Sequence, residues 1–237
     1  LYNICNMYNI VYSITFHQDI DFVNHFLKNI EKYNIENNYL VIIHLSDKLF
    51  KIKDQIYQKN VIINPIHYNK QLMTHLLMKP FIENCEYLIS KNIKFDNFIT
   101  LTSSNRLVRQ APKFEYKDIK LCENKVIQNT ADLKGWHWPK FLKNKKIVNI
   151  YKENKIKLIG GQVSGRLYHE KVITKICKFI RQNGIMKIFK NELCFEEIIL
   201  PSLANYYMKT KQHVYCHTFW GKSSEIPTID DVVQKLK

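Results

Sequence analysis

Residues 39–45 read YLVIIHL, and this strand-length, nearly continuous apolar run decides the fold class. A run of this composition is typical of a parallel strand whose two faces are both covered by helices. A similar run, IVYSITF, occupies residues 10–16, and apolar side chains recur at helical spacing over residues 22–30. Asp19 precedes that helical pattern at the place of an N-cap. The first 45 residues therefore predict a strand, a helix and a second, parallel strand.

The same alternation continues up to residue 101. A third strand is expected at residues 61–63, a long helix at 69–90 with Pro80 as a kink, and a fourth strand at 95–101. Strands that alternate with helices predict an α/β fold with a largely parallel central sheet and helices on both faces. Ligands of such sheets bind at the carboxyl ends of the strands, so functional residues are expected there.

The second half of the chain has a weaker pattern. Amphipathic helices are expected at residues 169–182 and 195–208, the latter interrupted by Pro201. A last strand is expected at 214–220 and a closing helix at 228–236. No repeat, low-complexity tract or domain boundary is visible, so the 237 residues are expected to form a single domain.

The formal net charge of +15 indicates an anionic partner but does not select one. Nucleic acid, acidic lipid, polyanionic glycan and nucleotide diphosphate would all be attracted to such a surface. The signatures GxxxxGK[ST], GxGxxG, HExxH and GxSxG are missing, so the common P-loop, dinucleotide-binding, zinc-protease and hydrolase classes lose their main support. An Asp-x-Asp triplet occurs at Asp19 and Asp21, where a helix cap is a better reading than a metal ligand.

The cysteines and the lengths of the apolar runs indicate in which cellular compartment the protein is expected. Cys85 and Cys177 fall in apolar helical patterns and are expected to be buried free thiols in a reducing compartment, with disulfides as the alternative in an oxidising lumen. No run is long enough for a membrane span, and the chain begins with Leu1, so an upstream segment could have been removed. We expect a cytoplasmic protein or one peripheral on the cytoplasmic membrane face, and a lumenal protein if an N-terminal anchor has been removed.

Three segments together carry a family resemblance. They are residues 13–47, which contain HQD after the first strand and YLVIIHLSDK later; residues 95–109, FDNFITLTSSNRLVR; and residues 160–207, which contain GGQVSGRLYHEKVITKICKFI and FEEIILPSLANYY. Their order resembles the core-2/I-branching β-1,6-N-acetylglucosaminyltransferase family and its bacterial and viral relatives. The resemblance covers most of the chain but depends on order and local pattern more than on any one motif.

The resemblance implies a reaction and a catalytic residue. The family transfers a sugar from a nucleotide-sugar with inversion, and the second acid of its "DE" pair is the general base. That position is Glu197 here, with Glu196 in the place of the first acid. A carboxylate within hydrogen-bond reach of an acceptor hydroxyl can take its proton in the transition state. The competing interpretation is that two acids merely occupy the first turn of a helix, where the helix dipole favours them.

The resemblance also implies a GT-A-like, Rossmann-related fold and a donor site that needs no metal. Basic side chains would neutralise the leaving diphosphate, and the candidates by position are Lys209, Lys211 and Lys222. A UDP-sugar is the expected donor, carrying N-acetylglucosamine or another hexose or pentose, and no other cofactor is expected. Residues 1–110 would bind the nucleotide-sugar, and residues 111–237 the acceptor.

Residues at the strand ends complete the expected site. The donor side would include His17, His44, Ser46 and Asp47, although Ser46 stands where the family has an Asp. The acceptor is expected to be a glycan or glycolipid. Its expected contacts are Ser104, Asn105, Arg106, Arg109, Glu196, Trp136 and Trp138, the two tryptophans as sugar-stacking rings.

Two other function classes remain open at this point. A basic nucleic-acid-binding module would use the lysine-rich residues 140–157 with Trp136 and Trp138, although no known nucleic-acid-binding motif is visible and no nucleic-acid partner is expected. A transferase-like scaffold without activity is the second alternative, because the change to Ser46 alters the expected nucleotide contact.

Overall fold

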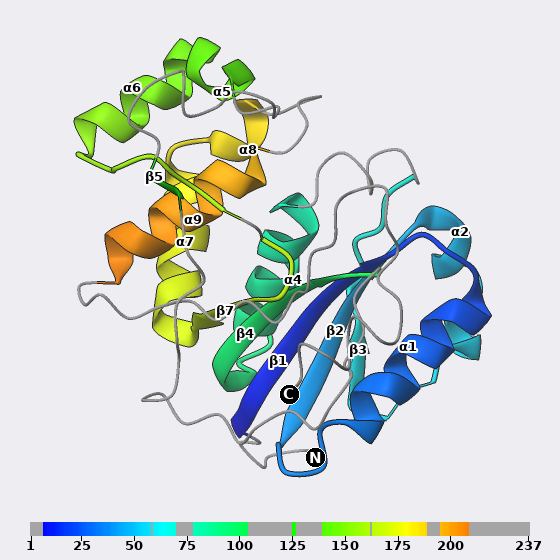
Figure 1. Cartoon of the computed structure of the whole chain (residues 1–237). Helices are drawn as coiled ribbons and strands as arrows, with labels where there is room; N and C mark the ends of the chain where they lie inside the picture. Colours follow the sequence, from blue (N-terminus) through cyan, green and yellow to red (C-terminus); the bar gives the residue numbers. More distant parts are fainter. Residues whose placement is uncertain are drawn as a thin grey trace, which may run out of the picture.

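The computed structural model of the chain describes residues 7–57, 59–69, 78–103, 125–126, 139–161, 163–188 and 195–208, with side chains left out at 125–126 and 139–140. Its centre is a five-stranded sheet in the order β3-β2-β1-β4-β7 (Figure 1). The strands are β1 (Met7–Phe16), β2 (Tyr39–Leu45), β3 (Val61–Ile63), β4 (Lys94–Thr102) and β7 (Arg166–His169). The first four are parallel, and β7 pairs antiparallel with β4. The fold is therefore α/β with a mostly parallel central sheet.

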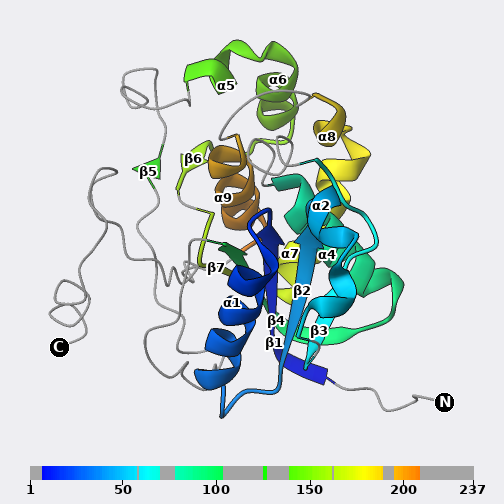
Figure 2. The same cartoon turned by 90° about the vertical axis from the view of Figure 1, so that its right-hand side faces the viewer.

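Helices cover both faces of this sheet. Helix α1 (Ile20–Lys32) packs on one face, and α4 (Met78–Ser90), α7 (Glu170–Gln182) and α9 (Glu196–Tyr207) pack on the other side (Figures 1 and 2). The shorter elements are α2 (Asp47–Phe50), η1 (Lys53–Gln55), α5 (Pro139–Lys143), α6 (Lys145–Glu153), α8 (Ile185–Ile188), β5 (Lys125–Val126) and β6 (Ile159–Gly160). β5 and β6 form a separate antiparallel pair.

The strand pleat divides the apolar residues between two cores. Val11 of β1 belongs to the core under α4, whereas its neighbours Ile10 and Tyr12 belong to the core under α1. This alternation follows from the two-residue period of a strand. Because both faces are covered, β2 is buried along its whole length, which explains why YLVIIHL lacks an apolar–polar alternation.

The face under α4 becomes polar toward the carboxyl ends of the strands. Ser13 and Thr100 lie side by side in the register of β1 and β4, and the next row on that face holds Thr15, His44 and Thr102. The adjacent row toward the amino ends, Val11, Leu40 and Phe98, is apolar. Polar side chains therefore collect at the sheet edge where parallel sheets bind ligands.

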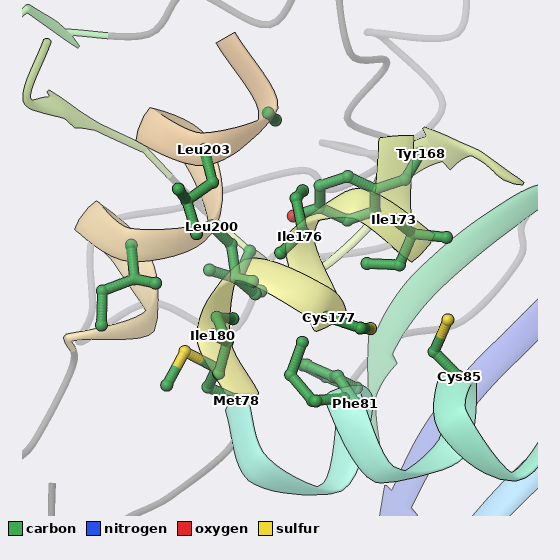
Figure 3. Close-up of a cluster of buried hydrophobic side chains, with 14 of the residues drawn as sticks. Met78, Phe81, Cys85, Tyr168, Ile173, Ile176, Cys177, Ile180, Leu200 and Leu203 are labelled. Atoms are coloured by element: carbon green, nitrogen blue, oxygen red, sulfur yellow. The ribbon is translucent and has the colours of Figure 1, made fainter. Parts of the chain in front are cut away.

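The helix α7 is the centre of the larger core. Ile176 and Ile180 on α7 lie between Phe81 of α4 and Leu200 of α9 (Figure 3). Cys85 and Cys177 face each other across α4 and α7, and both are buried free thiols, as expected for these two residues. The hydrogen bond with the Cys177 thiol and then burial raise the pKa of Cys85 well above its ordinary value, so it stays protonated.

Most predicted elements of the first half are confirmed. The strands at 10–16, 39–45 and 61–63 are present, and the fourth strand spans Lys94–Thr102. The described helix continues through Pro80 to Ser90, while residues 70–77 lie outside the described part of the chain. Asp19 caps α1, because its Oδ1 accepts a hydrogen bond from the backbone N–H of Phe22 at 2.7 Å.

One expectation for the second half is wrong, and two helices were not predicted. Helices α5 and α6 lie within a part of the chain whose sequence pattern is weak. The interruption of the last described helix at Pro201 does not occur, because α9 is continuous over Glu196–Tyr207. The strand expected at 214–220 and the helix expected at 228–236 lie outside the described residues.

Replacing Ile176 by alanine tests the importance of the α4–α7–α9 core. Ile176 is fully buried, so Ile176→Ala should lower the free energy of unfolding by about 2–5 kcal/mol through lost apolar burial and the cavity left behind. Lys178→Ala, at an exposed position of the same helix, should change it by less than about 0.5 kcal/mol. Urea unfolding of both variants measures the difference, and equal values would contradict the packing described above.

Candidate functional site

The order of the strands defines a switch point between β1 and β4. From β1 the chain moves outward to β2 and β3, and after α4 it returns to the other side of β1 as β4. Crevices at such points are the usual ligand sites of open α/β sheets. Gln18 follows β1 and Ser103 follows β4, and the Gln18 side-chain N–H donates to Ser103 Oγ at 2.5 Å. The two strand ends are therefore joined by polar side chains at the switch point.

The chain between β6 and β7 is attached to the carboxyl end of β4. The N–H of Gly165 donates to the carbonyl of Thr100 at 2.5 Å, and the N–H of Thr102 donates to Ser164 Oγ at 3.3 Å. Thr100 Oγ1 donates to the carbonyl of Val163. Gly165 has a φ of +77°, a backbone conformation that glycine adopts without a Cβ penalty. These bonds hold residues 163–165 against the edge that carries the switch point.

The other end of this segment is attached to α9 through Glu197. Pro201 has no N–H, so it cannot donate the helical hydrogen bond to the carbonyl of Glu197, four residues earlier. The N–H of Gly161 donates to that carbonyl instead, at 2.9 Å. Ser202 Oγ accepts a second hydrogen bond from the N–H of Ile159 at 2.8 Å, which fixes β6 along the helix.

These attachments determine where the two acids lie. Gly161 and Ser164 are three residues apart, so their Cα atoms are at most about 11 Å from each other. The backbone of Glu197 is hydrogen-bonded to Gly161, and Ser164 contacts Thr102 at the end of β4. The first turn of α9, with Glu196 and Glu197, is therefore held close to the carboxyl edge of the sheet.

Both acids of this turn are buried. Glu196 and Glu197 are 7% and 8% exposed, and Phe195 precedes them without a side-chain cap. The pKa of Glu196 is raised from its ordinary value of 4.5 to about 7, chiefly by burial; a backbone hydrogen bond opposes the rise, and the charge of Glu197 adds to it. Glu196 thus exchanges a proton close to neutral pH, which suits acid–base chemistry.

A second polar cluster lies between β2 and α4. His44 Nε2 is 3.3 Å from Glu83 Oε2, and the imidazole stacks on Tyr68 with ring centroids 4.9 Å apart. The Tyr68 hydroxyl donates to the Glu83 carboxylate, at 2.6 and 2.7 Å from its two oxygens. Lys79 Nζ lies 3.9 Å from Glu83 Oε1 and 4.1 Å from the centre of the Tyr68 ring.

Glu83 is ionised within this cluster. Burial by itself would raise its pKa, but the hydrogen bonds from His44 and Tyr68 and the charge of Lys79 outweigh burial and hold the pKa below its ordinary value. Asn84, the next residue of α4, donates to Ser13 Oγ at 3.0 Å. The cluster therefore connects α4 to both β1 and β2 through polar contacts inside the core.

The structure describes six of the residues proposed for catalysis, donor binding and acceptor binding. Glu196 and Glu197 share the first turn of α9, and His17 follows β1, partly exposed at the switch point. His44 is fully buried under α4 and contacts Glu83 and Tyr68. Ser46 is buried at the start of α2, and Asp47 Oδ1 pairs with His67 Nδ1 at 2.6 Å. The binding roles of these residues stay predictions.

The remaining proposed residues lie outside the described part of the chain. They are Ser104, Asn105, Arg106, Arg109, Trp136, Trp138, Lys209, Lys211 and Lys222.

Several polar residues at the site were not proposed as site residues from the sequence. Gln18 follows the end of the first predicted strand, where functional residues are expected, and Ser164 precedes Gly165 in a predicted loop. Arg166 of β7 is 1% exposed and lies beside Thr100 in the sheet register. A buried guanidinium is costly unless it is compensated, but nothing in the sequence pattern distinguished this arginine from the many surface bases.

Comparison with known proteins does not identify a family for the chain. No protein-family model matches the chain, and no curated protein matches it. Within the described residues there is no group of three or more His, Cys, Asp or Glu side chains that could hold a metal ion. The described helices are also too short or too polar to cross a membrane.

Replacing Glu196 by glutamine should remove a pH-dependent part of the stability. The folded-state pKa of about 7 lies above the ordinary value, so between these values the folded protein keeps a proton that the unfolded chain releases. The stabilisation is complete below the ordinary pKa and is lost as pH rises through 7. Relative to wild type, Glu196→Gln should therefore gain about 3 kcal/mol between about pH 4.5 and pH 8.5.

Urea unfolding at several pH values measures this difference. Glu153→Gln, at an exposed position on α6, is the matched control and should follow the wild-type pH dependence. Parallel curves for wild type and Glu196→Gln would show that burial does not perturb this carboxyl group.

Proposed function

We propose that the chain is an inverting glycosyltransferase with a GT-A-like fold, in which Glu197 is the general base. One observation carries the proposal: the buried Glu196–Glu197 pair is tied through Gly161 and Ser164 to the carboxyl edge of a mostly parallel sheet. That edge is where an open α/β sheet binds a nucleotide, so a base there stands next to the donor. The family resemblance of the sequence supports the same residue and the same reaction.

The proposed reaction is a single displacement. The acceptor hydroxyl oxygen forms a bond to the anomeric carbon of the donor sugar, and its proton passes to the Glu197 carboxylate. The bond from the anomeric carbon to the diphosphate oxygen breaks on the opposite face, and the nucleoside diphosphate leaves with the electron pair. A buried carboxylate is suited to this step, because little water competes for its hydrogen bond with the acceptor.

Glu196 has a distinct role in this proposal. Its raised pKa and the neighbouring charge of Glu197 favour a pair that carries one proton and one negative charge near neutral pH. The protonated Glu196 can donate a hydrogen bond to the acceptor while Glu197 accepts the proton of the reacting hydroxyl. Repulsion between two buried carboxylates is thereby avoided.

The donor would bind where β1 and β4 separate. His17, Gln18 and Ser103 offer hydrogen-bonding groups at the switch point, and Ser46 and Asp47 follow the adjacent strand. Lys209, Lys211 and Lys222 remain the candidates for neutralising the leaving diphosphate, in a site that works without a metal. A glycan or glycolipid is the proposed acceptor.

Release of nucleoside diphosphate from a panel of nucleotide-sugars, with EDTA present, tests the reaction. Glu197→Gln should reduce turnover by about 100-fold or more, because the amide cannot take the proton. Glu196→Gln should retain activity within about tenfold, because its amide still donates a hydrogen bond. The two substitutions are equal in size and charge and lie in the same turn, so each controls for the other.

Each alternative result has a distinct meaning. The opposite pattern, with Glu196→Gln inactive and Glu197→Gln active, would transfer the role of base to Glu196. Turnover that disappears in EDTA would overturn the metal-independent mechanism. No turnover with any donor, in a folded protein that binds oligonucleotides, would favour the basic nucleic-acid-binding module.

A further inference from the structure

The strongest one-signed charge in the described structure lies on α5, α6 and the turn that follows. Lys143, Lys145, Lys146, Lys152, Lys155 and Lys157 are all exposed there, and the same stretch contains one acid, Glu153. We call these six lysines the α6 basic face. Figures 1 and 2 show α5 and α6 together at one end of the molecule, away from β2 and β3.

The helix period separates this face from the core. Ile147 and Tyr151 of α6 are buried, while Lys145, Lys146 and Lys152 are exposed on the other side of the same helix. Val148 and Ile150 are half-buried and lie between the two sides. The result is an amphipathic helix with a cationic outer surface, apolar shoulders and a well-packed inner side.

Three basic residues outside this face have acidic partners. Lys59 pairs with Glu31, Lys79 with Glu83, and Arg181 with Glu86. Among the described residues, no lysine of the α6 basic face takes part in an ion pair. Like charges along one helix face repel each other. An anionic partner bound to this face would reduce the repulsion between the lysines.

The shape and composition of the face decide between anionic partners. Single-stranded nucleic acid is bound by a basic groove with exposed aromatic rings on which bases stack. Here the described aromatic residues, Phe141 and Tyr151, are buried, and the lysines project from a convex helix. An amphipathic helix with four to eight basic residues matches an anionic lipid leaflet, since the lysine stems and apolar shoulders can enter the headgroup region.

We propose that the α6 basic face docks the protein on an anionic membrane surface. The inference does not depend on the proposed transfer reaction, because docking needs neither a donor nor the Glu196–Glu197 pair. It goes beyond that function by assigning the contact to one described surface. If the reaction is as proposed, an acceptor anchored in lipid would be presented to the enzyme at the same membrane.

Vesicle sedimentation with the full chain tests the docking. Wild type should bind vesicles of phosphatidylcholine with one third phosphatidylserine and should bind pure phosphatidylcholine vesicles far more weakly. The triple variant Lys145→Glu, Lys146→Glu, Lys152→Glu should lose about 100-fold or more in partition coefficient. A second triple variant, Lys145→Gln, Lys146→Gln, Lys152→Gln, removes the positive charges with less risk of misfolding. Its partition coefficient should also fall by about 100-fold.

A matched control separates a local surface from bulk charge. Lys28→Glu, Lys51→Glu and Lys94→Glu change the net charge by the same amount at exposed positions on other elements. This variant should keep vesicle binding within about tenfold. Equal losses in the two glutamate variants would overturn the proposal, as would wild-type binding to oligonucleotides but not to anionic vesicles. Failure of docking would leave nucleoside diphosphate release from the donor in the presence of soluble acceptors unaffected, so the two proposals can fail separately.

Discussion

The hydrogen bond from the Gly161 N–H to the Glu197 carbonyl holds the two halves of the candidate site together. It exists because Pro201 has no N–H to give to that carbonyl, so a helical acceptor is left for another donor. Through it the β6–β7 segment is joined to α9, and through Ser164 and Gly165 the same segment is joined to β4. A proline inside a helix thus serves as an attachment point, and the helix remains continuous.

Burial decides the protonation of Glu196 beside this attachment point. A helix N-terminus stabilises a carboxylate by about 0.3–1 kcal/mol when the site is exposed, and this favours ionisation of Glu196. Its rise in pKa to about 7 corresponds to about 3 kcal/mol in the opposite direction. Burial, together with the neighbouring charge of Glu197, therefore outweighs the dipole at this position. The first turn of α9 holds a group whose proton is released near neutral pH.

At Glu83 the competition between burial, which raises a carboxyl pKa, and contacts that lower it has the opposite outcome. There burial is outweighed by hydrogen bonds from His44 and Tyr68 and by the charge of Lys79, so the carboxylate stays ionised. Two buried carboxyl groups in one protein thus differ in protonation, because His44, Tyr68 and Lys79 surround Glu83 whereas Glu196 has a second carboxylate, Glu197, beside it. The polar rows under α4 make this arrangement possible at the carboxyl end of the sheet.

The βαβ frame follows from local signals in the sequence. Apolar runs such as residues 39–45 and the cap at Asp19 are local signals, and local periodicity reflects burial directly. A family resemblance in the sequence also pointed to Glu196 and Glu197. Tertiary structure alone decided the antiparallel pairing of β7, the continuity of α9 through Pro201 and the contact of His44 with Glu83. Each of these depends on a partner distant in sequence, such as Gly161 for Glu197, and local pattern carries no information about such partners.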